Sequence, residues 1–143
     1  RKRIRMEDNT TKLVKIKLIG DAYIAIDPDR QVENDHGPTI YVYIGNHRVL
    51  QFDCFVHRPH YHYFSLVFMA ISEMYLIDKV LTGGNTVEYV IKMIEEHLSD
   101  MLKHCGYLEV AEAFDHDIDT QWFSALDEVR ERIKSATTET AKV

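Results

Sequence analysis

The stretch that decides the fold is TIYVYIGNHRVLQFDCFV, residues 39–56. On both sides of Gly45-Asn46 it is rich in β-branched and aromatic residues, which favour extended strands. A Gly-Asn pair suits the tight two-residue turns that join antiparallel strands. The stretch therefore predicts a β-hairpin formed by residues 39–44 and 47–56.

The residues before this hairpin indicate further strands. Residues 12–20 (KLVKIKLIG) and 22–26 (AYIAI) are predicted to form two strands or one bent strand, with Gly20-Asp21 between them. Residues 27–38 (DPDRQVENDHGP) are rich in charges and turn formers, and are predicted to form a loop.

After the hairpin, HYHYFSLVFMAI (60–71) is predicted to continue the sheet, with Pro59 at an edge, a bulge or a strand start. Two alternatives stay open over residues 64–81. A helical stripe also fits there, formed by Val67, Ala70, Ile71, Met74, Ile77 and Leu81. A strand over 64–71 would be apolar on both faces, so something outside its own helices, such as another subunit, would have to cover it.

The hydrophobic period changes near residue 82 and then indicates helices. Apolar residues at three- and four-residue steps between Val87 and Leu102 predict an amphipathic helix, capped by Asn85 or Thr86 and ended by Gly106. A short helix over 108–114 is predicted next, and DHDID (115–119) would supply caps for a last helix. The stripe predicted to be buried on that helix is Trp122, Phe123, Leu126, Val129 and Ile133.

Strands followed by helices predict an α+β domain. We expect an antiparallel sheet of about four to five strands in the N-terminal half, packed by two to three C-terminal α-helices. The expected limits are a flexible basic arm over 1–11, a single domain over 12–136 and a disordered tail over 137–143.

Charge and hydropathy exclude some partners. No run of 18 uncharged apolar residues is present, and the opening RKRIR is unlike a signal peptide, so a membrane is not an expected partner and the expected location is the cytoplasm. The 143 residues carry a net charge of −6. Without the four basic residues among the first five, 13 basic residues face 23 acidic ones, which argues against a nucleic-acid partner.

The segment FDCFVHRPHYHY (52–63) is the strongest candidate for chemistry. Its spacing is C-x2-H-x2-H-x-H, and residues two apart in a strand share a face, so His60 and His62 can present two nitrogens to one ion. A bend at Pro59 could add His57 or Cys54. We therefore predict a metal site formed by Cys54, His57, His60 and His62, with zinc as the expected metal. His47 and Asp53 are spare candidates.

Two alternatives to metal binding stay open for this segment. The histidines can instead be packed in an aromatic-rich sheet with their nitrogens bonded to carbonyls or Tyr hydroxyls, and a buried Cys can be a small apolar residue. The segment can also line a functional cleft without a metal.

Other motifs favour structural roles. His97, Met101 and His104 share a helix face and could hold a second metal, but surface or interface histidines are more common. The 115–119 run lacks the Gly and the distant Glu of a calcium loop and favours helix capping. Gly83-Gly84-Asn85 favours a turn over an anion site.

The stretch VLQFDCFVHRPHYHY, together with TVEYVIKMIEEHLSDMLKHCGYLEVAEAFD downstream, resembles a family of small uncharacterised prokaryotic proteins. The resemblance covers roughly residues 39–129 and departs at 64–71, where FSLVFMAI replaces an expected polar loop. It implies an intact motif and no particular reaction. A fainter similarity, limited to the His-rich hairpin, is to small toxins of toxin–antitoxin pairs.

Three functions follow as hypotheses. The first is a small zinc-binding accessory or structural subunit of a larger cytoplasmic enzyme complex, similar in role to the small zinc-bearing subunits of multi-subunit carboxylases. It would have protein partners or form a homo-oligomer. The second is an independent metalloenzyme in which His57, His60 and His62 hold Zn²⁺ or Fe²⁺ and Asp53 orients a ligand or acts as a base. The third is a toxin of the toxin–antitoxin type.

Overall fold

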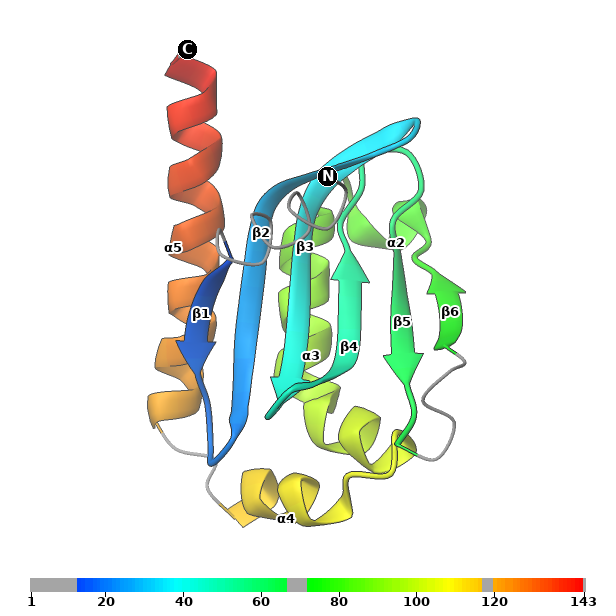
Figure 1. Cartoon of the computed structure of the whole chain (residues 1–143). Helices are drawn as coiled ribbons and strands as arrows, with labels where there is room; N and C mark the ends of the chain where they lie inside the picture. The colour runs from blue at the N-terminus through cyan, green and yellow to red at the C-terminus, as the bar shows by residue number, and fades with distance from the viewer. Residues whose placement is uncertain (1–12, 67–71, 117–119, 143) are drawn as a thin grey trace, which may run out of the picture.

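The computed structural model describes residues 13–66, 72–116 and 120–142. Within these ranges, six strands come first and four helices follow (Figure 1). The strands are β1 (Val14–Lys17), β2 (Ala22–Val32), β3 (Asp35–Ile44), β4 (His47–Asp53), β5 (His60–Phe64) and β6 (Ser72–Leu76). The helices are α2 (Lys79–Thr82), α3 (Thr86–His104), α4 (Leu108–His116) and α5 (Thr120–Lys142). The α+β class is confirmed, with six strands instead of four to five and with the single turn α2 as an additional helix.

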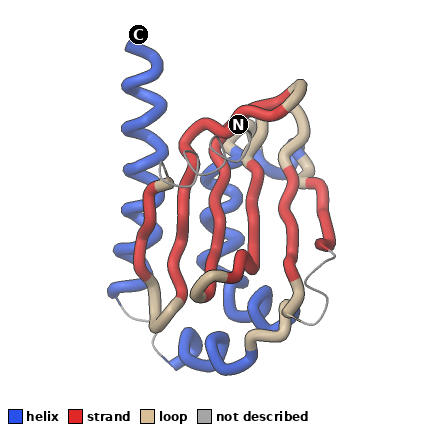
Figure 2. Tube along the Cα trace, viewed as in Figure 1, coloured by secondary structure: helices blue, strands red, loops and turns tan. Residues whose placement is uncertain are grey.

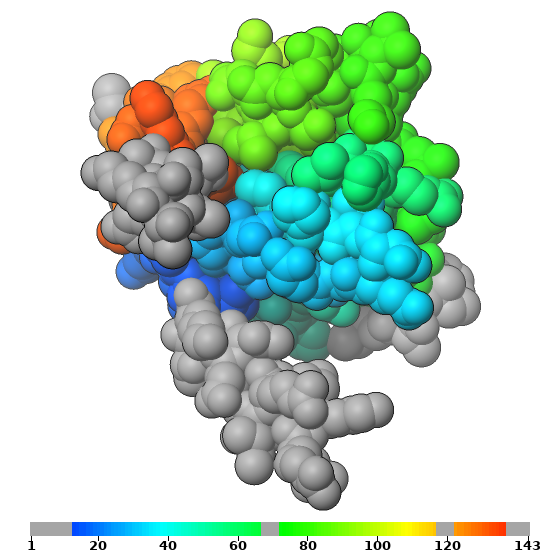
Figure 3. All heavy atoms as spheres, turned by 90° about the horizontal axis from the view of Figure 1, so that it is seen from above, coloured from blue at the N-terminus to red at the C-terminus, as the bar shows by residue number. Residues whose placement is uncertain are grey.

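The six strands form one antiparallel sheet in sequence order, β1-β2-β3-β4-β5-β6. Helices α3 and α5 cover one face of it, and α4 lies across one end (Figures 1 and 2). Viewed from above, the strands and the two long helices form separate layers (Figure 3). We call the sheet face opposite α3 and α5 the front face.

The hydrophobic core fills the space between the sheet and the helices. Alternate strand residues such as Ile24, Ile40 and Phe52 are fully buried there, because residues two apart point to the same face. From the helices, Ile91 and Leu126 reach the same core. The intervening strand residues therefore belong to the front face.

The predicted hairpin of residues 39–56 is confirmed as β3 and β4, with Ile44 opposite His47. Gly45 has φ 59, the left-handed backbone that a glycine adopts at little cost in this kind of turn. Of the two alternatives predicted for residues 12–26, the structure has two separate antiparallel strands, β1 and β2, and not one bent strand.

The loop predicted for residues 27–38 is wrong. Strands β2 and β3 continue through it as a paired hairpin, with Val32 opposite Asp35 and a tight turn at Asn34, whose φ is 72. The turn-forming residues of this segment do not form one loop, because they lie at two different places in the hairpin. Pro28 lies where the register shifts between Asp27 and Arg30, and a bulge tolerates proline because no ladder hydrogen bond is needed there.

Residues 60–64 are the strand β5, with Pro59 directly before it, and residues 72–76 are the strand β6. The part of 64–81 that the structure describes is therefore a strand and then a single helical turn, and it contains no helix continuous with α3. Residues 67–71, which carry most of the segment predicted to be apolar on both faces, lie outside the described residues.

Helix α3 begins and ends close to the expected positions. The Asn85 side chain accepts a hydrogen bond from Glu88 N at 3.1 Å and caps α3, and Gly106 has φ 95. Phe123 is an exception to the predicted stripe of α5, since it is 47 % exposed while Leu126 is buried. Residues 117–119 of the predicted capping run lie outside the described residues.

The backbone of α5 runs to Lys142, and the side chains of its last residues are not described, so the predicted disordered tail stays a prediction.

None of the helices in the described ranges is long and apolar enough to cross a membrane.

Candidate functional site

Three potential metal ligands meet on the front face, where β4 and β5 lie side by side. Asp53 ends β4 opposite His60, and Gln51 lies opposite His62. One ligand atom each from Asp53, His60 and His62 lies within 4.8 Å of the others. We call these three residues the front-face cluster.

Asp53 is held in one orientation by residues from three strands. Its side chain is 1 % exposed. Oδ1 accepts hydrogen bonds from Arg30 Nη1 at 2.8 Å, Thr39 Oγ1 at 2.9 Å and Gln51 Nε2 at 3.1 Å. Oδ2 accepts from Gln51 Nε2 at 3.0 Å and lies 2.9 Å from His60 Nε2. The buried carboxylate is therefore paired with a guanidinium, and its Oδ2 is directed at the histidines.

His60 is fixed by its other ring nitrogen. Nδ1 lies 2.8 Å from the carbonyl oxygen of Arg58, and because a carbonyl oxygen only accepts, we assign the proton to Nδ1. In a neutral ring Nε2 then carries a lone pair, which faces the Asp53 carboxylate at 2.9 Å. Two acceptors at this distance require a positive charge between them or on the ring, either a second proton or a metal ion.

His62 is the third residue of the front-face cluster, and its ring has different surroundings from that of His60. Its Nε2 lies 3.5 Å from Asp53 Oδ2, and its Nδ1 is buried without a hydrogen-bond partner among the described residues. Burial lowers the pKa of His62, and the charge of Asp53 acts in the opposite direction without reversing the shift. The ring is therefore neutral at pH 7, so it has a nitrogen lone pair available to bind a metal.

Two imidazoles and one carboxylate form a donor set that suits a transition metal. Zinc accepts nitrogen and oxygen ligands, and a 2-His-1-carboxylate set also binds Fe²⁺. Metal-binding histidines usually donate their second ring N–H to a carbonyl or carboxylate, as His60 does toward Arg58. Three protein ligands leave at least one coordination position for a water or a substrate.

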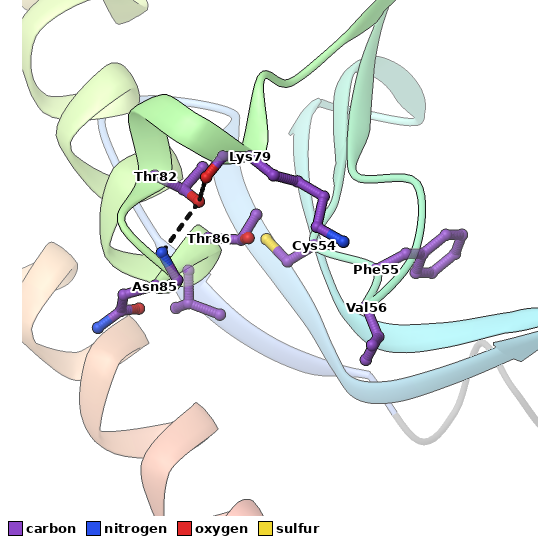
Figure 4. Close-up of a pocket in the computed structure, with 9 residues that line it drawn as sticks. Cys54, Phe55, Val56, Lys79, Thr82, Asn85 and Thr86 are labelled. Carbon is purple, nitrogen blue, oxygen red and sulfur yellow. Dashed lines mark hydrogen bonds between the residues drawn. The ribbon is translucent and has the colours of Figure 1, made fainter.

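Cys54 lies on the other face of the sheet. It follows Asp53 directly, and its side chain belongs to the hydrophobic core. Figure 4 shows the sulfur directed toward Thr86 at the start of α3, in a cavity of about 330 Å³ that Lys79 also lines. Burial raises the pKa of the Cys54 thiol, which disfavours the thiolate form that binds metals. The structure does not bring Cys54 to the histidines.

His57 and His47 also lie outside the front-face cluster. The backbone N–H of His57 donates to Asp35 Oδ1 at 3.0 Å, in the connection between β4 and β5. His47 is the first residue of β4 and Asp53 is the last, so the length of the strand separates them.

The histidines of α3 lie on the core side of the sheet, beside three tyrosines. His97, Met101 and His104 line a cavity of about 450 Å³ together with Tyr61, Tyr63 and Tyr75. His104 Nε2 lies within hydrogen-bonding distance of Glu73 Oε1, at 2.8 Å, and this contact joins α3 to β6. In the described part of the chain, no set of three ligands is present there.

The sequence pattern did not single out Arg30, Thr39 and Gln51, which surround Asp53. One signal was available: Gln51 and Asp53 alternate with Leu50 and Phe52, and polar residues in a strand this apolar need buried partners. The alternation of polar and apolar residues does not reveal Arg30, because Arg30 reaches the site from the β2–β3 hairpin, where the sequence predicts a loop.

Residues 19–133 match the DUF7700 family, described as a domain of unknown function, and the chain belongs to this family. No curated protein matches the chain. No solved structure matches it.

Proposed function

We propose that this domain is a metalloprotein that binds one transition-metal ion through Asp53, His60 and His62, and that the ion takes part in catalysis. The observation that carries the proposal is the position of His60. Its Nδ1 donates to the Arg58 carbonyl, and its Nε2 faces a buried carboxylate oxygen at 2.9 Å. A second proton on the ring would satisfy both acceptors as an ion pair, whereas a divalent cation would satisfy them and also bind a nitrogen of His62, whose ligand atom lies within 4.8 Å of the other two.

The number of protein ligands and the residues around them support a catalytic metal site and not a structural one. Structural zinc sites have four protein ligands, whereas the front-face cluster has three. An ion bound there would polarise a substrate oxygen or lower the pKa of a bound water. Arg30, Thr39 and Gln51 hold Asp53 in place, which is how outer hydrogen bonds orient a metal ligand.

Elemental analysis of protein purified without an affinity tag tests the proposal. We expect close to one transition-metal ion per chain, with zinc the first candidate, and we expect His60→Ala and His62→Ala each to lose it. His57→Ala is the matched control, because it removes a histidine of the same motif that lies outside the cluster. A chain that holds no metal as isolated, and whose melting temperature added Zn²⁺ or Fe²⁺ does not raise, would overturn the proposal.

A second candidate function is that of a subunit within a larger enzyme assembly, and strand β6 favours it. All five residues of β6 are exposed at the edge of the sheet. Met74 is 51 % and Leu76 is 59 % exposed. The opposite edge, β1, carries Lys15 and Lys17, which discourage pairing with another strand.

Light scattering during size-exclusion chromatography tests the subunit candidate. We expect the purified chain to self-associate as its concentration rises, and the double variant Met74→Lys, Leu76→Lys to stay monomeric. A wild-type chain that remains a soluble monomer and captures no partner in native pull-downs would count against it.

A further inference from the structure

The front-face cluster lies between two arginines, each resting on a phenylalanine that contacts one of the histidines. The guanidinium carbon of Arg30 lies 5.8 Å from the centre of the Phe55 ring, and that ring lies 5.6 Å from His60. On the other side, the guanidinium carbon of Arg48 lies 4.3 Å from the centre of the Phe64 ring. The Phe64 ring stacks on His62 at 5.8 Å.

The two arginines differ in what they bind. Arg30 donates to Asp53 Oδ1 at 2.8 Å and so belongs to the support of the cluster. The Arg48 side chain forms no hydrogen bond or ion pair with residues in the described ranges; its guanidinium stacks on the Phe64 ring, and its charge also acts on His62 and Tyr43. Stacking on an aromatic ring restricts the guanidinium without using its N–H donors, so Arg48 is oriented and its donors stay available.

The charge of this face points to an anion. The whole chain carries −6, yet strand register places Lys15, Lys17 and Arg48 on the front face. Two carboxylates lie on the same face, Asp27 and Asp53. The charge of Asp53 is balanced by its ion pair with Arg30. A bound divalent cation would add further positive charge at the centre, and such a face attracts anions.

We propose that the ligand of this site is a small molecule that carries a carboxylate or phosphate group, with one oxyanion oxygen on the metal and Arg48 pairing with the ligand's negative charge. This rests on the proposed metal site. Arg48 is suited to the task because its planar fork of donors matches two oxygens of a carboxylate or phosphate. Arg48 is a ligand-binding residue in this arrangement, while Arg30 is a positioning residue that acts through Asp53.

Calorimetric titration of zinc-loaded, dialysed protein tests the inference, with inorganic phosphate in one arm and malonate in the other. The arm with the tighter binding identifies which oxyanion the site prefers. We expect Arg48→Met to weaken binding of the preferred anion by about tenfold to a hundredfold, as for the loss of hydrogen bonds to a charged group. We expect Arg48→Lys to recover part of the loss.

Lys17→Met is the matched control, since it removes one positive charge from the same face but from β1. It should change the affinity by less than about threefold, because exposed charges at a distance are screened by salt. The zinc content and the melting temperature of each variant are measured alongside, and we expect both to match the wild type for Arg48→Met.

The outcomes separate the two proposals. A wild-type chain that holds zinc but binds neither anion would overturn the oxyanion inference and leave the metal site standing. Equal affinity in the wild type and Arg48→Met would do the same. A chain that holds no zinc would overturn the metal site and the inference that depends on it.

Discussion

At the scale of single residues, Gly37 shows how closely the β2–β3 hairpin approaches β4. Its φ is 152, and a Cβ atom there would lie 2.3 Å from the carbonyl oxygen of Cys54. It would also lie 3.0 Å from the Cα of Phe55, and because both of these neighbours are backbone atoms, neither can move aside as a flexible side chain could. Cys54 directly follows Asp53, the last residue of β4, so this close approach lies next to the front-face cluster.

We therefore expect Gly37→Ala to lower the free energy of unfolding by about 3 kcal/mol or more, since overlap adds to an unfavourable backbone conformation. Gly20→Ala is the control, because Gly20 also has a positive φ but has no atom within 4 Å of an added Cβ. Its expected cost is about 1 kcal/mol. Urea titration measures both, and equal costs would show that the approach to Cys54 does not matter.

The same scale shows which site residues the sequence could predict. His60 and His62 follow from the two-residue period of a strand, and the structure places them together with Asp53. The inclusion of Cys54 depended on a bend at Pro59 that would bring it over the same point. The backbone stays extended up to Asp53, so the adjacent Cys54 points to the opposite face.

At the scale of elements, the hairpin over residues 27–38 differs from the predicted loop for a physical reason. Its composition is typical of a loop, but Pro28 lies in a bulge and Asn34 forms part of a two-residue turn. The hairpin is stabilised by distant contacts, since Cys54 N donates to Pro38 O at 2.8 Å and Val56 N donates to His36 O at 2.9 Å. A local pattern cannot show such contacts, whereas the period of α3 is local and was sufficient.

Helix α5 offers a test of which face packs on the sheet. Leu126 is 1 % exposed in the core, while Phe123, one turn earlier, is 47 % exposed. We expect Leu126→Ala to cost about 2–5 kcal/mol of unfolding free energy, through lost burial and the cavity left behind. Phe123→Ala should cost less than about 1 kcal/mol. The difference is measured by chemical denaturation, and a larger cost for Phe123 would contradict the orientation of α5.

The ion pair between Glu88 on α3 and Arg130 on α5 joins the two helices that cover the sheet. Arg130 Nε and Nη2 donate to the two carboxylate oxygens of Glu88, each at 3.0 Å. These hydrogen bonds lower the pKa of Glu88. A carboxyl group with a lowered folded pKa stabilises the fold above its unfolded pKa, about 4.3, and loses that contribution as the pH falls through the folded value.

We therefore expect Arg130→Met to lower the free energy of unfolding by about 0.5–1 kcal/mol at pH 7, because the pair is bidentate but partly exposed. The deficit should shrink as the pH falls through the lowered pKa of Glu88. Urea titrations across that range check this, with Arg132→Met as a control, since among the described residues Arg132 pairs with Glu128 of the same helix. A deficit that does not change with pH would rule out the carboxylate as its source.

At the scale of the whole molecule, the site and the core share the same strands. Phe52 faces the helices while Asp53 faces the front, so any opening of β4 disturbs both. Each strand pairs with its neighbour in sequence, so the front-face cluster is built within a single hairpin. This locality explains why the placement of His60 and His62 on one face follows from the sequence.

Trp122 is the single tryptophan of the chain. Its fluorescence reports on the hydrophobic core between the sheet and the helices. Trp122 is 8 % exposed and packs against Phe114 with ring centres 5.4 Å apart. Because its core is continuous with the residues behind β4 and β5, we expect Trp122 fluorescence and far-UV circular dichroism to give coincident thermal transitions.

Zinc binding at the front-face cluster should then raise both transitions by the same amount, although Trp122 does not belong to the cluster. A ligand that binds only the folded state at a concentration of 100 times its dissociation constant stabilises it by about 2.7 kcal/mol. His60→Ala should show coincident transitions without the zinc shift. If zinc moved the circular dichroism transition and left the Trp122 transition in place, the two sides of the sheet would unfold separately, and a ligand on the front face would not stabilise the helical layer.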